Sequence, residues 1–289
     1  MALTTSSSSD QMIEDFILSQ NLSENTVKSY RSLLNNFFRY LNDRELTRKD
    51  VAIFVKKEKQ KGLADGTIKA KLTVIRCYAK WLWEEDLLLS KEYKKILGLK
   101  IKLDYGEDGR RALTEEEIEL GYNKLVNPIL RMLFWTGLNY GLRRSEYINL
   151  KMDDIDLLNR IVTIRHSKGN KTRRIKILKT HVPVWRDWFV TRDSYQLDHD
   201  FVFFTDRGRA GTRSIERYFN KISEILLGNK EITSHTLRYT FAVRCWRSEM
   251  DLLVLSKILG HSNLRTTQTY LRVIEHEILE KYEEQASRI

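Results

Sequence analysis

The chain has 289 residues, of which 50 are Lys or Arg and 39 are Asp or Glu, so its formal net charge is +11. Hydrophobic residues make up 42% and charged residues 31%, with only 13 glycines and 2 prolines. This composition excludes a collagen-like, low-complexity or disulfide-scaffold protein and favours a helix-rich globular chain of about two domains. The positive excess indicates a polyanionic partner, nucleic acid first and an acidic membrane second.

Several features bear on the compartment. No apolar run approaches the ~18 residues of a membrane span. Residues 1–9 form a Ser/Thr-rich stretch without the basic and apolar regions of a signal peptide, which predicts a disordered tail. Cys77 and Cys245 lie far apart in apolar-periodic stretches, which is typical of buried free thiols. We therefore expect a soluble cytoplasmic protein with no membrane partner.

Residues 10–98 are expected to form a domain of short amphipathic helices. Ser23 is a candidate N-cap, because apolar residues recur after it at spacings of three and four. Thr47 and Asp50 resemble a capping box at the start of the next helix. A longer helix after Gly66 carries cations on its polar face, namely Lys69, Lys71, Arg76 and Lys80. That face is either a solvated helix surface or a surface that follows phosphates.

Residues 99–111 lose this periodicity and gain charge, which predicts an interdomain linker. Thr114, followed by three glutamates, then predicts a capped helix start within a second domain over residues 112–270. Helical patterns dominate this domain. Alternation within 155–165, and again at Ile175 and Ile177, predicts an antiparallel hairpin with its tip at residues 167–170. The expected fold class is mainly α with a small antiparallel β-sheet.

Candidate chemistry gathers in three local runs and at the hairpin tip. The runs are 140–146, 235–238 and 259–261, the last followed nine residues later by a tyrosine. In chain order the residues are Arg143, Lys168, His235, Arg238, His261 and Tyr270. Each alone is common on a surface or in a core, but the ordered set suits metal-free phosphoryl transfer. Guanidinium groups can neutralise a phosphodiester, a tyrosine can attack phosphorus, and His and Lys can serve as base and acid. No compact cluster suggests a metal, and no cofactor is expected.

These runs resemble motifs of the tyrosine recombinase, or phage integrase, family, and most closely its two-domain Xer-like members. The family box G-[LM]-R-x-[SG]-E matches residues 141–146, K-G-N-K matches 168–171, H-x-L-R matches 235–238, and L-G-H matches 259–261. The resemblance covers nearly the whole chain. Tyr239 stands where many members have a second His, and His166 and Ser167 precede the lysine where Gly is commoner. The resemblance implies an N-terminal helical, SAM-like core-binding domain and a mixed α/β catalytic domain.

The resemblance also implies the chemistry of strand exchange. Tyr270 would attack a DNA phosphodiester and leave a 3′-phosphotyrosine and a free 5′-hydroxyl. Lys168 would protonate the departing oxygen, and His235 would accept the tyrosine proton or bind the phosphate. The 5′-hydroxyl of a partner strand would then reverse the reaction through a Holliday junction, with no cofactor.

The scissile phosphate itself would be held by Arg143, Arg238 and His261, with Glu146 orienting the arginines. The partner would be duplex DNA carrying a specific recombination site, and the protein would be nucleoid-associated. The four cations Lys69, Lys71, Arg76 and Lys80 would then contact DNA.

The tail, residues 271–289, alternates apolar residues with five glutamates, which predicts an amphipathic helix. Such a helix commonly packs on its own domain. The resemblance instead implies docking in trans, so that the chain assembles as a dimer or tetramer on DNA.

Four functions remain open at this stage. The first is a Xer-type recombinase that resolves replicon or chromosome dimers, with roles in chromosome partition and cell division. The second is an integrase or transposase of a mobile element or virus with the same chemistry. A helix expected from Asp10 leaves little room for the extra arm-binding domain common in that group, which favours the first. The others are a type IB topoisomerase and a catalytically inactive DNA-binding protein.

Overall fold

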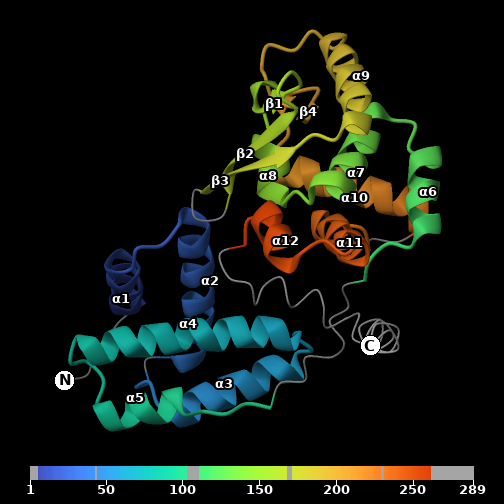
Figure 1. Ribbon diagram of the computed structural model, residues 1–289. Coiled ribbons are helices and arrows are strands. Elements are labelled where there is room, and N and C mark those ends of the chain that lie inside the picture. The colour runs from blue at the N-terminus through green and yellow to red at the C-terminus, as the bar shows by residue number, and fades with distance from the viewer. Residues whose placement is uncertain (1–5, 43, 103–110, 168–170, 229–230, 262–289) are drawn as a thin grey trace, which may run out of the picture. The chain divides into compact units, whose positions relative to one another are not determined.

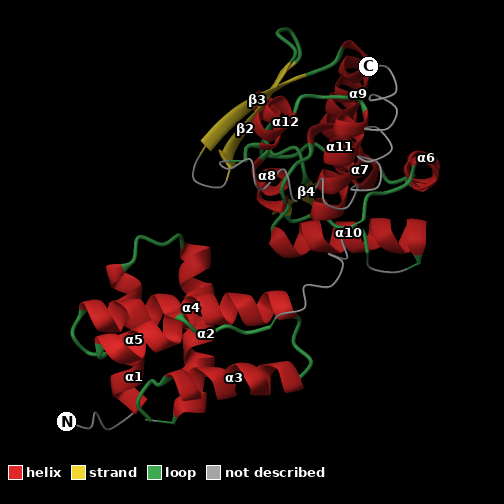
Figure 2. Ribbon diagram, turned by 60° about the horizontal axis from the view of Figure 1, so that its bottom comes forward, coloured by secondary structure: helices red, strands yellow, loops and turns green. Residues whose placement is uncertain are grey.

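The computed structural model describes residues 6–42, 44–102, 111–167, 171–228 and 231–261. The chain divides into two compact units, Met1–Asp108 and Gly109–Ile289, which are described separately below (Figure 1). In both units helices predominate, as expected from the composition (Figure 2). None of the helices in the described ranges is long and apolar enough to cross a membrane.

The first unit is helical throughout its described part. Its helices are α1 (Ser6–Ser19), α2 (Glu24–Leu41), α3 (Arg48–Gln60), α4 (Asp65–Glu84) and α5 (Ser90–Leu97). Their apolar stripes meet in a core rich in aromatic rings. There the ring of Phe16 packs edge-on against that of Tyr78, with 5.4 Å between the ring centroids. Offset and edge-to-face ring pairs add to area burial, so this core favours one packing arrangement of the helices.

The predicted start of this unit needs a correction. A disordered tail was expected over residues 1–9, but α1 already begins at Ser6. Serine is well suited to a helix start, because the first amide groups have no partner within the helix and hydroxyls can accept their hydrogen bonds. A Ser-rich run is therefore compatible with a first helical turn.

Cap signals in this unit were partly right. Thr47 caps α3, and its side chain accepts a hydrogen bond from the amide of Asp50 at 3.2 Å. Ser23 stands at the N-cap position of α2, but its hydroxyl contacts that of Thr26 at 2.9 Å instead of a helix amide. Cys77 is a free thiol that is half-buried, not fully buried as expected. Cys245 of the second unit is half-buried too, and burial raises its pKa to about 11.

The second unit combines a small sheet with a helical body. The sheet has the order β1-β2-β3, all antiparallel, from β1 (Ile155–Asp156), β2 (Ile161–Ser167) and β3 (Lys171–Lys176). The expected hairpin and fold class are confirmed, although the hairpin tip, residues 168–170, lies outside the described residues. A second pair consists of β4 (Phe204–Thr205) and β5 (Gly208–Arg209).

The rest of this unit is largely helical, and several of its helices pack against α7. The helices are α6 (Glu115–Lys124), α7 (Pro128–Tyr140), α8 (Arg144–Asn149), α9 (Val182–Asp193), α10 (Thr212–Leu227), α11 (Ser234–Arg247) and α12 (Leu252–Leu259), with short 3₁₀ turns at Met152–Asp154 and Lys179–His181. Thr114 and Glu117 form the predicted capping box at the start of α6.

Two glycines let α7 and α11 approach closely. A Cβ at Gly137 would lie 2.6 Å from a methyl carbon of Leu237 on α11. Gly141 ends α7 with φ of +56°, a left-handed conformation that side chains rarely adopt. Its Cβ would lie 2.6 Å from the ring of Phe241. The chain therefore turns tightly between α7 and α8 and lies directly against α11.

Candidate active site

Arg143 stands at the turn between α7 and α8, where it is the N-cap residue of α8. Its backbone amide donates to Glu146 Oε2 at 2.8 Å, and its Nη1 donates to Glu146 Oε1 at 3.0 Å. Its Nη2 donates to the carbonyl of Gly260 at 2.9 Å, just past the end of α12. Two contacts, to Glu146 and to the carbonyl of Gly260, therefore fix the guanidinium of Arg143, and a third holds its backbone.

Arg238 approaches the same place from the middle of α11, and it is only 2% exposed. Its Nη1 donates to the carbonyl of Gly141 at 2.7 Å, and its Nη2 donates to that of Leu259 at 2.6 Å. Gly260 adopts φ of +66° at the end of α12, so the carbonyls of adjacent residues 259 and 260 each meet a different arginine. The close packing of α7, α11 and α12 thus brings the two guanidinium groups to one site (Figure 1).

Among the described residues, Glu146 supplies the carboxylate at this site, and it is 2% exposed. It accepts hydrogen bonds from Arg173 of β3, from Nη1 to Oε1 at 2.6 Å and from Nη2 to Oε2 at 2.8 Å. Burial alone would raise the pKa of Glu146. The hydrogen bonds and charge of Arg173, the amide of Arg143 and the charge of Arg238 outweigh burial and lower that pKa to about 2. The carboxylate is therefore ionised at neutral pH.

His261 completes the cluster beside Arg238. Its Nε2 lies 2.9 Å from Arg238 Nη2. Burial, followed by the charges of Arg238, Arg143 and Arg173, lowers the pKa of His261 to about 4. The imidazole is therefore neutral at pH 7. Since a guanidinium only donates, Nε2 must be the accepting nitrogen and Nδ1 carries the proton.

The charges of the cluster as a whole suit it to bind an anion. Three guanidinium groups contribute +3, the carboxylate of Glu146 contributes −1 and the imidazole is neutral, which leaves +2. The groups are largely buried, and their attraction for an anion is stronger there than in bulk water. Such fixed donors suit the charge of a phosphodiester, which grows in the transition state of phosphoryl transfer.

Sequence reasoning found Arg143, Glu146, Arg238 and His261 but missed Arg173. The signal that could have found Arg173 was the alternation of inward-facing and outward-facing residues along the second strand of the hairpin. Residues 173 and 175 share one face of β3, and Ile175 and Ile177, which directly follows the strand, are both buried. An arginine at the same parity therefore points inward, where its charge needs an acidic partner.

His235 lies one turn before Arg238, at the start of α11, and its side chain is exposed. With Arg111, Glu231 and Thr236, among others, it lines a pocket of about 360 Å³. The structure therefore places it on the same helix as Arg238 and beside this pocket.

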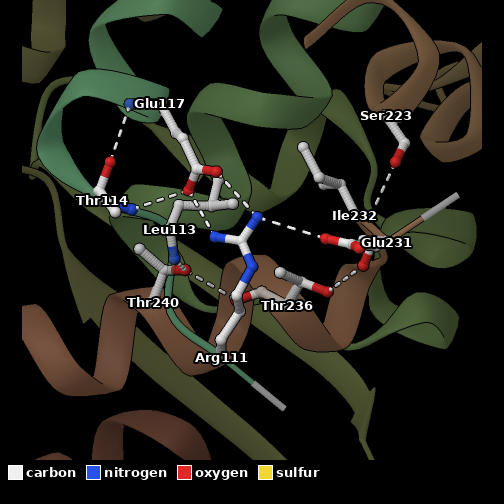
Figure 3. Close-up of polar contacts among 9 residues, drawn as sticks. All are labelled: Arg111, Leu113, Thr114, Glu117, Ser223, Glu231, Ile232, Thr236 and Thr240. Atoms are coloured by element: carbon white, nitrogen blue, oxygen red, sulfur yellow. Dashed lines mark hydrogen bonds and ion pairs between the residues drawn. The ribbon is translucent and has the colours of Figure 1, made fainter. Parts of the chain in front are cut away.

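The helix α11 is anchored along this pocket by polar contacts (Figure 3). Arg111 bridges Glu117 of α6, at 2.6 and 2.8 Å, to Glu231 at 3.3 Å. The amide of Leu113 donates to the buried hydroxyl of Thr240 on α11 at 2.9 Å. The segment that precedes α6 is thereby attached to the helix that carries both His235 and Arg238.

The cations expected to form one DNA-contacting face are not equivalent in the structure. Lys71 donates to Glu58 and, at 3.0 Å, to Asn36, and its side chain is only 11% exposed. Arg76 donates to the carbonyl of Leu99 at 2.6 Å and is half-buried. Lys71 and Arg76 are thus held by partly buried contacts within their own unit.

The other two cations of that face, Lys69 and Lys80, are exposed. Lys80 forms an ion pair with Glu84 at 3.1 Å, one helical turn away. The predicted nucleophile Tyr270, the predicted acid Lys168 and the tail 271–289 lie outside the described residues. Among the residues that the structure does describe, no group of His, Cys, Asp or Glu could hold a metal ion.

Comparison with known proteins now gives the family. Residues 113–277 match the phage integrase family, and residues 10–86 match the phage integrase N-terminal SAM-like domain. The chain belongs to the phage integrase family. This membership confirms the expected tyrosine recombinase resemblance and the expected enzyme class, a DNA strand transferase.

Xer proteins are among its relatives. Tyrosine recombinase XerC of Bacillus pumilus is 27% identical over 293 residues, which cover 93% of each chain. Tyrosine recombinase XerD of Listeria monocytogenes is 29% identical, with 95% of this chain and 98% of that protein covered.

Solved structures share the fold. The Tn1549 transposon integrase in complex with transposon right end DNA is similar with a TM-score of 0.74 and 19% identity, over 90% of this chain and 93% of that chain. XerH bound to palindromic difH substrate gives a TM-score of 0.71 at 20% identity, over 94% and 83%. XerA recombinase gives 0.55 at 24% identity, over 95% and 98%.

Proposed function

We propose that this chain cuts and rejoins duplex DNA at a specific site through a 3′-phosphotyrosine intermediate, as a Xer-type recombinase. The observation that carries the proposal is the buried cluster of net charge +2 in which Arg143 and Arg238 are fixed by backbone carbonyls and by Glu146. Membership of the phage integrase family supports the same chemistry.

In this proposal Arg143, Arg238 and His261 bind the scissile phosphate. The arginines neutralise the oxygens that do not take part in bond breaking, where charge accumulates in the transition state. Neutral His261 donates one hydrogen bond to the phosphate from the nitrogen that carries its proton. Glu146 orients the arginines and does not touch the phosphate.

The covalent step then exchanges one ester bond for another. The Tyr270 oxygen bonds to phosphorus while the bond to the 5′-oxygen breaks, and the phosphate remains attached at its 3′-oxygen. His235 accepts the phenol proton or binds the phosphate, and Lys168 protonates the departing 5′-oxygen. Attack by the 5′-hydroxyl of a partner strand releases Tyr270, so strand exchange passes through a Holliday junction and conserves the bond energy.

The parts of the chain divide this work as follows. Residues 10–98 are a core-binding domain, 99–111 a linker, 112–270 the catalytic domain and 271–289 a tail that docks on a neighbouring protomer. The match of a SAM-like domain to residues 10–86 supports the first assignment. We further propose assembly as a dimer or tetramer on DNA, in the cytoplasm and associated with the nucleoid.

A duplex with a nick close to the cleavage site tests the proposal. Cleavage releases a short fragment that carries the free 5′-hydroxyl, and loss of this fragment prevents religation and traps the adduct. We expect the intact chain to form a covalent protein–DNA adduct and Tyr270→Phe to form none. Tyr195→Phe, at an exposed tyrosine against Phe204, is the matched control and should behave as the intact chain does. Adducts formed by Tyr270→Phe would contradict the assignment of the nucleophile.

Sequencing of the DNA ends recovered in that adduct would identify the target. Ends within one repeated chromosomal or replicon site would support resolution of dimers. Ends at the borders of a mobile element would favour the integrase or transposase alternative, which shares the same chemistry.

A further inference from the structure

Arg173 is a third guanidinium at the candidate active site, and no motif of the sequence singled it out. Its side chain is 9% exposed and forms a two-pronged contact with Glu146 from β3. A planar fork that meets both carboxylate oxygens gives defined geometry as well as charge neutralisation.

The contacts of Glu146 explain what Arg173 does there. An ionised carboxylate offers about four acceptor positions. Arg173 donates to both oxygens, Arg143 Nη1 donates to Oε1 at 3.0 Å, and the Arg143 amide donates to Oε2 at 2.8 Å. With all four positions used, Glu146 has one orientation, and Arg143 takes its position from it.

Gly260 brings the two arginines together on the other side. A Cβ there would lie 3.1 Å from Arg173 Cδ and 3.6 Å from Arg143 Nη1. The same residue supplies the carbonyl that holds Arg143 Nη2. The end of α12 therefore packs against both guanidinium groups at once, and a shift of Arg173 would disturb both contacts of Arg143.

We propose that Arg173 is a positioning residue for strand cleavage, which holds Arg143 in its productive orientation through Glu146. The inference rests on the proposed function and adds to it a link between the hairpin and the phosphate site. Arg173 lies on β3, five residues after Lys168 in the sequence, so one strand carries the support of Arg143 and follows directly on the proposed acid.

The charge of Arg173 provides a second readout. Among the described residues, the charged groups that act on His261 are Arg143 at the N-cap of α8, Arg173 of β3, Arg238 of α11 and Glu146 of α8, and each arginine lowers the pKa of His261. Arg173 also lowers the pKa of Glu146. Its removal raises both pKa values, so the loss of activity on acidification begins at a higher pH.

The test compares single-turnover adduct formation by the intact full chain, Arg173→Ala, Arg173→Lys and Arg174→Ala on the nicked duplex, at saturating DNA and across pH. Arg174 is the matched control, because it is adjacent on β3 but exposed.

We expect Arg173→Ala to lower the rate roughly 10²-fold, as misplacement of a transition-state group does, with a much smaller change in half-saturating DNA concentration. The acid limb of its pH profile should move to higher pH. Arg173→Lys keeps the positive charge but loses the two-pronged guanidinium contact. The acid limb of its pH profile should therefore stay where it is in the intact chain, and its rate should lie between those of Arg173→Ala and the intact chain. Arg174→Ala should match the intact chain.

Three results would overturn the inference. One is an Arg173→Ala rate close to that of the intact chain. Another is a rate loss with an unchanged acid limb, since a merely structural role reduces the folded fraction without moving a pKa. If Arg173→Ala does not fold, the test passes to Arg173→Lys, where a rate equal to that of the intact chain would contradict any need for the fork. Failure of the intact chain to form adducts would instead contradict the proposed function.

Discussion

In the described part of each unit a glutamate is buried between two cations, and the two clusters differ in the kind of cation. Glu58 in the first unit and Glu146 in the second are both 2% exposed. Glu58 accepts from Lys61 at 2.6 Å and from Lys71. Glu146 accepts from Arg143 and Arg173. In both, burial works to raise the pKa of the carboxyl, and the hydrogen bonds and charges of its partners outweigh burial and lower it.

The lysine cluster is suited to stability. Lys71 is almost buried and lies 5.5 Å from the ring centroid of Phe54, so it joins α4 to the core on α3. Lys61 is 61% exposed and closes the pair at the surface. An ammonium is a compact charge, and here it neutralises a buried carboxylate.

The arginine cluster is suited to binding. A guanidinium has five N–H donors in a fixed plane. One group can therefore donate hydrogen bonds to a carboxylate and still have donors left for a phosphate. Arg238 adds a third cation to the same site. The comparison teaches that a buried carboxylate suits the orientation of cations for chemistry when its partners are arginines, and suits holding helices together when its partners are lysines.

The largest expected effect separates the two glutamates by their influence on cleavage. Glu146→Gln removes the charge that fixes Arg143 and Arg173, so we expect single-turnover adduct formation to fall about 10³-fold at saturating DNA. Glu58→Gln, measured as a matched control on the folded protein, should change that rate less than about threefold, because its partners are structural. Equal losses in the two variants would contradict the comparison.

Acid should weaken the second unit through the same carboxylate. The pKa of Glu146 is lowered from its usual value of 4.5 to about 2 in the folded state. This gap is worth roughly 3 kcal/mol of folding free energy, present above pH 4.5 and lost as the pH falls toward 2. His261, with its pKa lowered from 6.5 to about 4, also binds protons more readily when unfolded, so its contribution is lost between those values.

Hydrogen exchange of α8 amides between pH 7 and pH 3 measures this dependence within one unit. Glu146→Gln should remove the loss of amide protection that occurs below pH 4.5. His261→Gln should remove the loss of protection that begins near pH 6.5. An acid dependence of α8 that is unchanged in both variants would show that other groups control it.

Replacing the lysine partner should affect stability but not chemistry. Lys71→Met leaves Glu58 with Lys61 alone in a nearly buried place, and we expect the first unit to lose about 2 kcal/mol in denaturant unfolding. The double variant Glu58→Met with Lys71→Met removes both buried charges and should recover most of that loss. A double variant as unstable as the single one would mean that the charges are not the cause.

Contacts between residues close together in the sequence could be predicted from the sequence pattern, whereas contacts between distant residues could not. The capping box of Thr114 and Glu117 spans three residues, so local pattern sufficed. The gathering of Arg143, Arg238 and His261 came from the family motifs, because their contacts cross more than 90 residues for Arg238 and Gly141 and depend on helix packing. The partner of Lys71 lies on another helix, and a helical stripe does not show what faces it.

The smallest expected effect concerns the two cations that remain exposed on α4. Lys80 can reach a phosphate at little cost, since its pair with Glu84 is a surface contact between half-exposed side chains, and Lys69 is exposed as well. If they contact DNA, each change to Ala should reduce the slope of log affinity against log salt by about one and leave the cleavage rate at saturating DNA unchanged. Lys71→Met should leave the slope as it is, because its ammonium is held by Glu58 and Asn36. Titration of labelled duplex at several salt concentrations measures all three. Slopes that are unaffected by Lys69→Ala and Lys80→Ala would assign this face to solvent, and a reduced slope for Lys71→Met would mean that the lysine leaves its carboxylate when DNA binds.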